Sequence, residues 1–79
     1  MKNRHGLLPL GKLKEGEDGI IVDLVEGDLS LKLMEMGFLP GEKIKVSKIA
    51  PLGDPISVKI GTYLLSIRKE EANIVLVQR

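Results

Sequence analysis

Apolar and polar positions alternate in short runs along much of this chain. Residues 20–25 read Ile-Ile-Val-Asp-Leu-Val, and residues 42–46 read Glu-Lys-Ile-Lys-Val. A period of two is typical of a β-strand with one buried face. In the second run the phase slips before Ile49, which predicts a β-bulge near Ser47 or Lys48. The apolar run at residues 74–77 predicts a last strand that pairs with the first.

The strongest local pattern is a β-hairpin centred on Gly61 and Thr62. Glycine at the first central position favours a two-residue type II′ turn, which fixes the register of the strands on either side. That register places three apolar pairs on one face: Ile60 with Tyr63, Val58 with Leu65, and Ile56 with Ile67. The other face then carries Ser57 opposite Ser66 and Lys59 opposite Leu64, with Arg68 beyond.

A short helix is predicted after Gly27, with Asp28 or Ser30 as the N-cap. Leu29, Leu33 and Met36 share one side of it, whereas Leu31 and Met34 project elsewhere. Five residues are predicted to have structural roles: four end this helix and turn the chain, and the fifth starts the hairpin turn. Gly37 closes the helix in a left-handed conformation, Phe38 packs back on Leu33, Pro40 and Gly41 form a type II turn, and Gly61 starts the hairpin turn.

The remaining segments are short. We expect residues 1–6 to be a flexible tail, residues 7–13 to cover one end of a barrel, and residues 50–55 to form a stiff loop. Residues 69–73 are polar and rich in helix formers, enough for one helical turn. The pattern predicts a mainly β protein, a small five-stranded barrel with one short helix between the first two strands and a helical turn before the last. Residues 7–79 form its single domain.

Composition narrows the functional classes. The chain has 79 residues, with 12 Lys and Arg against 11 Asp and Glu, so its net charge of +1 provides no general attraction for polyanions. It has no cysteine, and aromatic residues make up 3% of the sequence. Nothing approaches the ~20 apolar residues of a membrane span, and no signal-peptide pattern is present. We therefore expect a soluble cytoplasmic protein.

Candidate chemistry is sparse. The only histidine is His5, in the predicted tail, so no Ser-His or Cys-His pair is expected and no catalytic residue is predicted. One histidine cannot form a two-histidine iron site, and Met34 and Met36 point in different directions on the helix. We predict no metal ligand and no tightly bound cofactor. A weak or subunit-bridging site for ferrous or another divalent metal remains open.

Two surface features remain. Lys43, Lys45, Lys59 and Arg68 form a basic stripe on the outer sheet face, which suits RNA or an acidic protein but also the ordinary solvated face of a sheet. Five apolar residues are less expected in the core than the alternating strand residues: Leu31, Met34, Leu39, Leu52 and Leu64. They form either a contiguous patch for a partner or scattered exposed leucines and methionine.

Several motifs, in this order and spacing, resemble the bacterial ferrous iron transport protein A (FeoA) family. They are Leu-Met-Glu-Met-Gly-Phe-Leu-Pro-Gly at 33–41, Ala-Pro-Leu-Gly-Asp-Pro at 50–55, Gly-Thr-Tyr-Leu-Leu-Ser-Ile-Arg at 61–68 and Glu-Glu-Ala at 70–72. The resemblance runs from about Leu8 to Val77. It implies an SH3-like barrel, transition-metal binding at the level of the family only, and a cytosolic accessory role in ferrous iron uptake. The implied partner is the cytoplasmic region of FeoB, a membrane iron transporter with a GTPase domain.

These observations favour a non-enzymatic protein-interaction module that acts on FeoB and is recruited by it to the inner face of the membrane. The expected contact residues are Leu31, Met34, Leu39, Pro51, Leu52, Gly53, Asp54, Pro55 and Leu64. Neither nucleic acid nor membrane insertion is expected, and self-association stays open. The alternative is a small-barrel nucleic-acid-binding domain, or a domain like the C-terminal domain of the diphtheria-toxin-repressor family of metal-dependent regulators.

Overall fold

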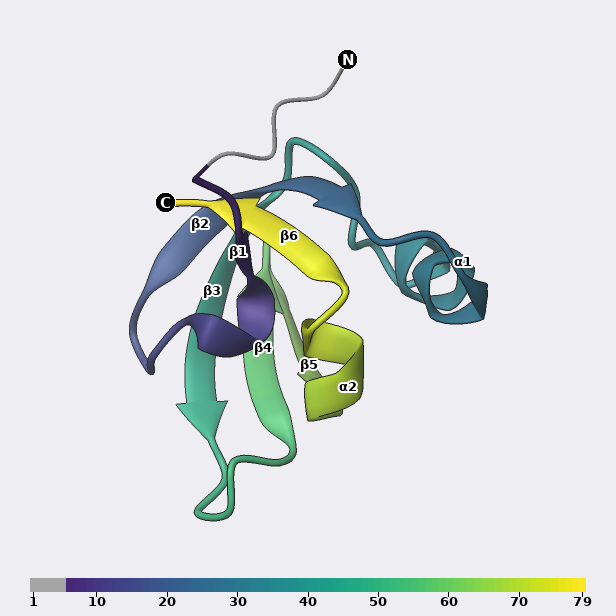
Figure 1. Cartoon of the computed structure of the whole chain (residues 1–79). Coiled ribbons are helices and arrows are strands. Elements are labelled where there is room, and N and C mark those ends of the chain that lie inside the picture. The colour runs from purple at the N-terminus through teal and green to yellow at the C-terminus, as the bar shows by residue number, and fades with distance from the viewer. Residues whose placement is uncertain (1–5) are drawn as a thin grey trace.

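The computed structural model describes residues 6–79, which form one antiparallel sheet curled around a single core (Figure 1). The sheet order is β1-β6-β2-β3-β4-β5. The elements are β1 (Leu8–Pro9), the 3₁₀ helix η1 (Leu10–Lys12), β2 (Asp18–Leu24), α1 (Asp28–Glu35), β3 (Lys43–Ile49), β4 (Ile56–Ile60), β5 (Tyr63–Ile67), α2 (Lys69–Ala72) and β6 (Val75–Gln78). The predicted mainly β class, with its two short helices, is confirmed.

The described residues form six strands where the sequence predicted five. The additional strand is β1, which pairs Leu8 and Pro9 with Val77 and Leu76 of β6. Two residues, one of them proline, carry no alternation that could be read from sequence, so only the completed sheet defines this strand. Leu10 and Leu13 follow it into the core, where both are buried. Of the predicted tail, residues 1–5 lie outside the described part.

Two β-bulges shape the long strands. The predicted one is present in β3, where the pairing with β4 shifts between Val46 and Lys48. A second lies in β2, where the pairing with β6 shifts between Ile21 and Asp23. It changes the phase of the strand, so that Ile21 and Leu24 both face the core. The uninterrupted alternation expected for residues 20–25 was wrong for this reason.

The β4–β5 hairpin has the predicted register at every pair from Ile60↔Tyr63 to Ile56↔Ile67. The face that carries the six apolar side chains is not buried throughout, because Tyr63 is 72% exposed. Tyr63 follows the turn directly, at the end of the hairpin. Leu65 is half-buried, and the remaining members of the set are buried.

Helix α1 begins one residue after Gly27, so neither Asp28 nor Ser30 is its N-cap. Ser30 acts from inside the first turn instead. Its hydroxyl accepts a hydrogen bond from the Gly27 amide (3.2 Å) and donates one to the Gly27 carbonyl (2.7 Å). Because both bonds satisfy the hydroxyl locally, with the backbone of Gly27, Ser30 can be buried there.

The end of α1 follows the prediction. Gly37 has φ +107°, its amide donates to Met34, and the Phe38 amide donates to the Leu33 carbonyl, both at 3.0 Å. This is the Schellman pattern, and it buries Phe38 and Leu33 together. The predicted turn follows, with the Glu42 amide donating to the carbonyl of Leu39 at 3.1 Å. Within nine residues the chain has left the helix and entered β3.

One ion pair joins the two helices. Lys32 Nζ of α1 lies 2.7 Å from Glu71 Oε2 of α2, and the Arg68 amide donates to Glu71 Oε1 at 2.8 Å. The lysine hydrogen bond, followed by the backbone hydrogen bond from Arg68, lowers the pKa of Glu71. Glu71 is buried and fully partnered, so it stabilises the fold and offers no free carboxylate for chemistry.

Candidate protein-interaction surface

An apolar groove lies between the end of α1 and the β4–β5 hairpin. It has a volume of about 480 Å³. Its lining residues come from two stretches of sequence: Met36, Gly37, Leu39 and Glu42 on one side, and Ile60, Gly61, Thr62, Tyr63 and Leu65 on the other. Exposed apolar side chains gathered in a concave surface are typical of a binding site for another protein or a ligand.

Two local structures build this groove. The Schellman end at Gly37 sends Phe38 into the core and leaves Met36 and Leu39 on the surface. The Gly61 turn, with φ +59°, holds Tyr63 on the opposite wall. The glycines that the sequence predicts at the helix end and at the hairpin turn therefore also set the shape of the groove.

The structure separates the predicted contact residues into four places. Of these residues only Leu39 lines the groove. Leu31 and Met34 are exposed on α1, and Leu64 lies on the outer face of β5. The Pro51–Pro55 loop joins the ends of β3 and β4 that lie away from α1, so it sits at the far end of the barrel (Figure 1). Leu52, 97% exposed, is therefore not part of one surface with Leu39.

Sequence reasoning missed Met36, Tyr63 and Leu65 as surface groups. All three fitted a core pattern, Met36 by helical spacing and the other two by strand alternation. For two of them the available signal was a position next to a turn, Met36 before Gly37 and Tyr63 after Thr62. Apolar residues at such sites often lie at the rim of a small core rather than within it.

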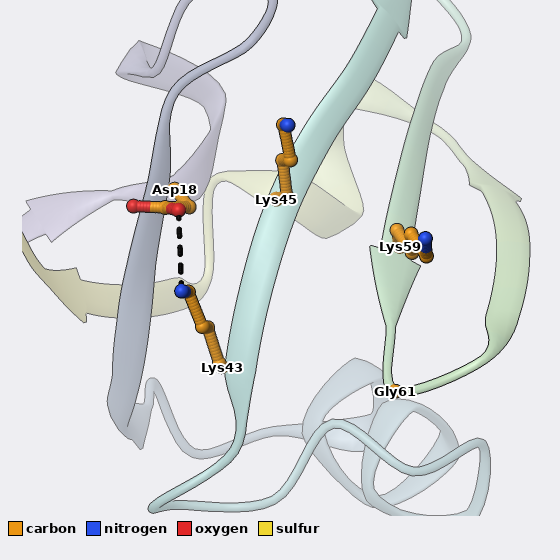
Figure 2. Close-up of a pocket in the computed structure, with 5 residues that line it drawn as sticks. All are labelled: Asp18, Lys43, Lys45, Lys59 and Gly61. Carbon is orange, nitrogen blue, oxygen red and sulfur yellow. Dashed lines mark ion pairs between the residues drawn. The ribbon is translucent and has the colours of Figure 1, made fainter.

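A second concave surface lies on the outer face of β2, β3 and β4 (Figure 2). Its volume is about 310 Å³, and it is lined by Asp18, Lys43, Lys45, Lys59 and Gly61. Lys43 Nζ reaches toward Asp18 Oδ2, at 3.6 Å, while Lys45 points away from that pair. Lys45 and Lys59 are direct cross-strand partners, an arrangement of like charges that disfavours the sheet.

The predicted basic stripe is thus present as a cleft containing three of its four residues. Arg68 follows β5 in extended conformation, at the opposite end of that strand from Gly61, and does not line the cleft. Among residues 6–79, Lys45, Lys59 and Arg68 form no ion pair. Because Gly61 lines both concavities, the basic cleft and the apolar groove meet at the β4–β5 turn.

The described residues contain no group of three His, Cys, Asp or Glu side chains that could hold a metal ion. His5 lies outside them. No helix within residues 6–79 has the length and apolar character needed to cross a membrane.

Comparison with protein families settles the classification. Residues 8–79 match the model of the FeoA domain. This chain belongs to the FeoA family. One curated relative is the Fe(2+) transport protein A/Fe(2+) transporter FeoB fusion protein of Porphyromonas gingivalis, which is 38% identical over 64 residues. The match covers 80% of this chain but only 8% of that protein.

Solved structures agree with this classification. Iron(II) transport protein A of Clostridium thermocellum is 42% identical with a TM-score of 0.81, over 90% of this chain and 45% of that one. FeoA of Stenotrophomonas maltophilia, complexed with zinc and described as a procaryotic SH3 domain protein, is 28% identical with a TM-score of 0.72, over 87% of both chains. The predicted SH3-like fold is confirmed. A manganese-dependent transcriptional repressor, 16% identical with a TM-score of 0.82 over 91% of this chain and 41% of its own, shares the fold alone.

Proposed function

We propose that this FeoA-family chain is a non-enzymatic accessory protein of ferrous iron uptake that docks on the cytoplasmic region of a FeoB transporter. The observation that carries the proposal is the Porphyromonas gingivalis relative, in which a FeoA domain and FeoB are parts of one polypeptide. Covalent linkage holds two domains at an effective concentration of roughly millimolar, which favours pairs that act together. Where the two domains are not linked, the surface of the FeoA domain must supply the affinity.

The apolar groove is the surface best suited to that role. It contains exposed Met36, Leu39 and Tyr63, and aromatic and methionine side chains are enriched at the centres of protein interfaces. The adjoining cleft adds Lys45 and Lys59, which form no ion pair within residues 6–79. These charges favour an acidic partner and faster encounter with it. The Pro51–Pro55 loop is the competing contact site, and its distance from the groove allows the two to be tested separately.

A matched pair of substitutions distinguishes the two sites. Leu39→Glu places a charge in the groove, whereas Leu52→Glu makes the same change on the distal loop. With a soluble cytoplasmic region of FeoB as titrant, we expect Leu39→Glu to weaken binding by about tenfold or more, because a buried apolar contact is worth at least 1.4 kcal/mol. Leu52→Glu should leave the dissociation constant within about twofold.

Chemical-shift changes in the isotope-labelled protein, with and without guanine nucleotide, locate the contact independently. Shifts confined to residues 51–55 would move the docking site to the loop. No shifts in any nucleotide state would refute docking on this part of FeoB.

Ferrous iron is, in this proposal, the cargo of the transporter and not a cofactor of this chain. Residues 6–79 contain no group of three His, Cys, Asp or Glu side chains that could hold a metal ion. The Stenotrophomonas maltophilia relative is complexed with zinc, so a weak or bridging site stays open. An anaerobic ferrous titration followed by paramagnetic line broadening tests it. Saturable broadening at one group of residues, at micromolar metal, would contradict the proposal.

A further inference from the structure

The two edges of the sheet differ in how they are protected. At one edge β1 has two residues, and one of them is Pro9. At the other edge β5 is five residues long and pairs only with β4 in the sheet. Short strands and prolines are common ways to block further pairing at an edge. The β1 edge is therefore closed, and the β5 edge is open.

The hairpin turn determines which backbone groups of β5 are free. In a two-residue hairpin the residues flanking the turn, Ile60 and Tyr63, form a hydrogen-bonded pair, and bonded and non-bonded pairs then alternate. Leu64 and Ser66 fall at the non-bonded positions. Their N–H and C=O groups point away from β4, and no turn or loop backbone hydrogen bond between described residues involves them.

No protective feature lies within this edge. The sequence Tyr-Leu-Leu-Ser-Ile contains no charge and no proline, and its pairing with β4 has no bulge. Leu64 is 66% exposed. Such an edge is a ready template for an added strand.

The two faces beside this edge differ in chemistry. On the inner side, Tyr63 and Leu65 line the apolar groove. On the outer side, Lys59 lies on β4 opposite Leu64 of the edge strand, and Arg68 follows that strand. Neither cation forms an ion pair among the described residues. A strand added to β5 would direct alternate side chains to these two faces.

We infer that β5 accepts an extended segment of the partner protein as a further strand, in which apolar side chains alternate with acidic ones. The apolar side chains enter the groove, and the acidic ones lie beside Lys59 and Arg68. A second copy of the chain is the poorer occupant, because pairing two β5 strands would bring two sets of these cations onto one sheet. The inference rests on the proposed function for the partner's identity, but its chemistry comes from this edge alone.

Amide hydrogen exchange tests strand addition directly. The amides of Leu64 and Ser66 should exchange fast in the free protein and become protected when the FeoB cytoplasmic region is bound. Ser66→Pro removes one outward N–H without disturbing the pairing with β4, whereas Ser66→Ala keeps it. We expect about a tenfold loss of affinity for the proline variant, the equivalent of one to two hydrogen bonds, and less than twofold for alanine.

Charge is tested with a matched pair as well. Arg68→Glu should weaken binding severalfold, while Lys14→Glu, the same change in an exposed turn away from β5, should have little effect. A synthetic peptide of alternating glutamate and leucine serves as a second probe. It should protect the Leu64 and Ser66 amides more strongly than its glutamine–leucine counterpart.

The outcomes separate this inference from the proposed function. Binding of FeoB without protection of these two amides overturns strand addition but retains docking. If FeoB does not bind, docking fails, and protection by the glutamate–leucine peptide still supports the edge site, whereas its absence overturns it. Protection that rises with protein concentration alone identifies a second copy as the occupant and overturns the acidic partner.

Discussion

At the residue scale, Glu71 shows how one buried carboxylate holds two elements together. It accepts hydrogen bonds from Lys32 on α1 and from the Arg68 amide at the start of α2. Because both bonds lower its pKa, the ionised form stabilises the folded state. Lys32 is largely exposed, so solvent screening reduces the value of the pair.

We therefore predict that Glu71→Gln lowers the free energy of unfolding at pH 7 by about 1 kcal/mol. The pKa of Glu71 is lowered on folding, so its contribution is complete above the unfolded value of 4.5 and is lost as pH falls through the folded value. The difference between wild type and variant should shrink below pH 4.5. Urea unfolding at pH 7 and at acid pH measures it, with exposed Glu70→Gln as control. A difference that does not change with pH would contradict an electrostatic role.

At the scale of elements, the sequence predicted best those features of helices and strands that depend on residues close together in the chain. The register of β4 and β5 depends on the two-residue turn at Gly61, and the end of α1 depends on Gly37, so both could be deduced before the fold was known. The exposure of Tyr63 and the bulge in β2 could not, because they depend on where the barrel ends and on how β6 meets β2.

A prediction at this scale concerns the helix end. Gly37→Ala places a side chain at φ +107°, where the backbone favours glycine, although no atom would obstruct the new Cβ. We expect a loss of about 1–2 kcal/mol in the free energy of unfolding, from backbone strain alone. Chemical denaturation checks it. Glu35→Ala, in the last turn of α1, should change stability by less than about 0.5 kcal/mol. Because alanine favours the helix at both positions, a Gly37→Ala variant as stable as the wild type, or an equal loss in both variants, would contradict a requirement for the left-handed conformation at Gly37.

At the scale of the whole molecule, the candidate site is a product of topology. The groove joins residues 36–42 to residues 60–65, and the basic cleft joins β2, β3 and β4. Sequence reasoning found Leu39, Lys43, Lys45 and Lys59 individually, yet it also grouped Leu39 with the Pro51–Pro55 loop at the far end of the barrel. Distances between segments depend on the path of the sheet, and a single sequence does not specify that path residue by residue.

At the same scale, net charge and the salt dependence of binding distinguish a protein partner from RNA. A single-stranded RNA bound through Lys45, Lys59 and Arg68 would contact about three phosphates, so its affinity should fall roughly twentyfold between 50 and 200 mM salt. With a net charge of only +1 and almost no aromatic surface for stacking, we expect such binding to be undetectable at physiological salt. Fluorescence anisotropy with a labelled oligonucleotide, alongside the FeoB titration at the same salt concentrations, makes the comparison. Strong RNA binding with the full salt dependence, together with a FeoB complex too weak to measure, would assign this surface to nucleic acid. A FeoB complex whose affinity falls only a few-fold over the same range of salt would assign the surface to a protein partner held mainly by apolar contacts.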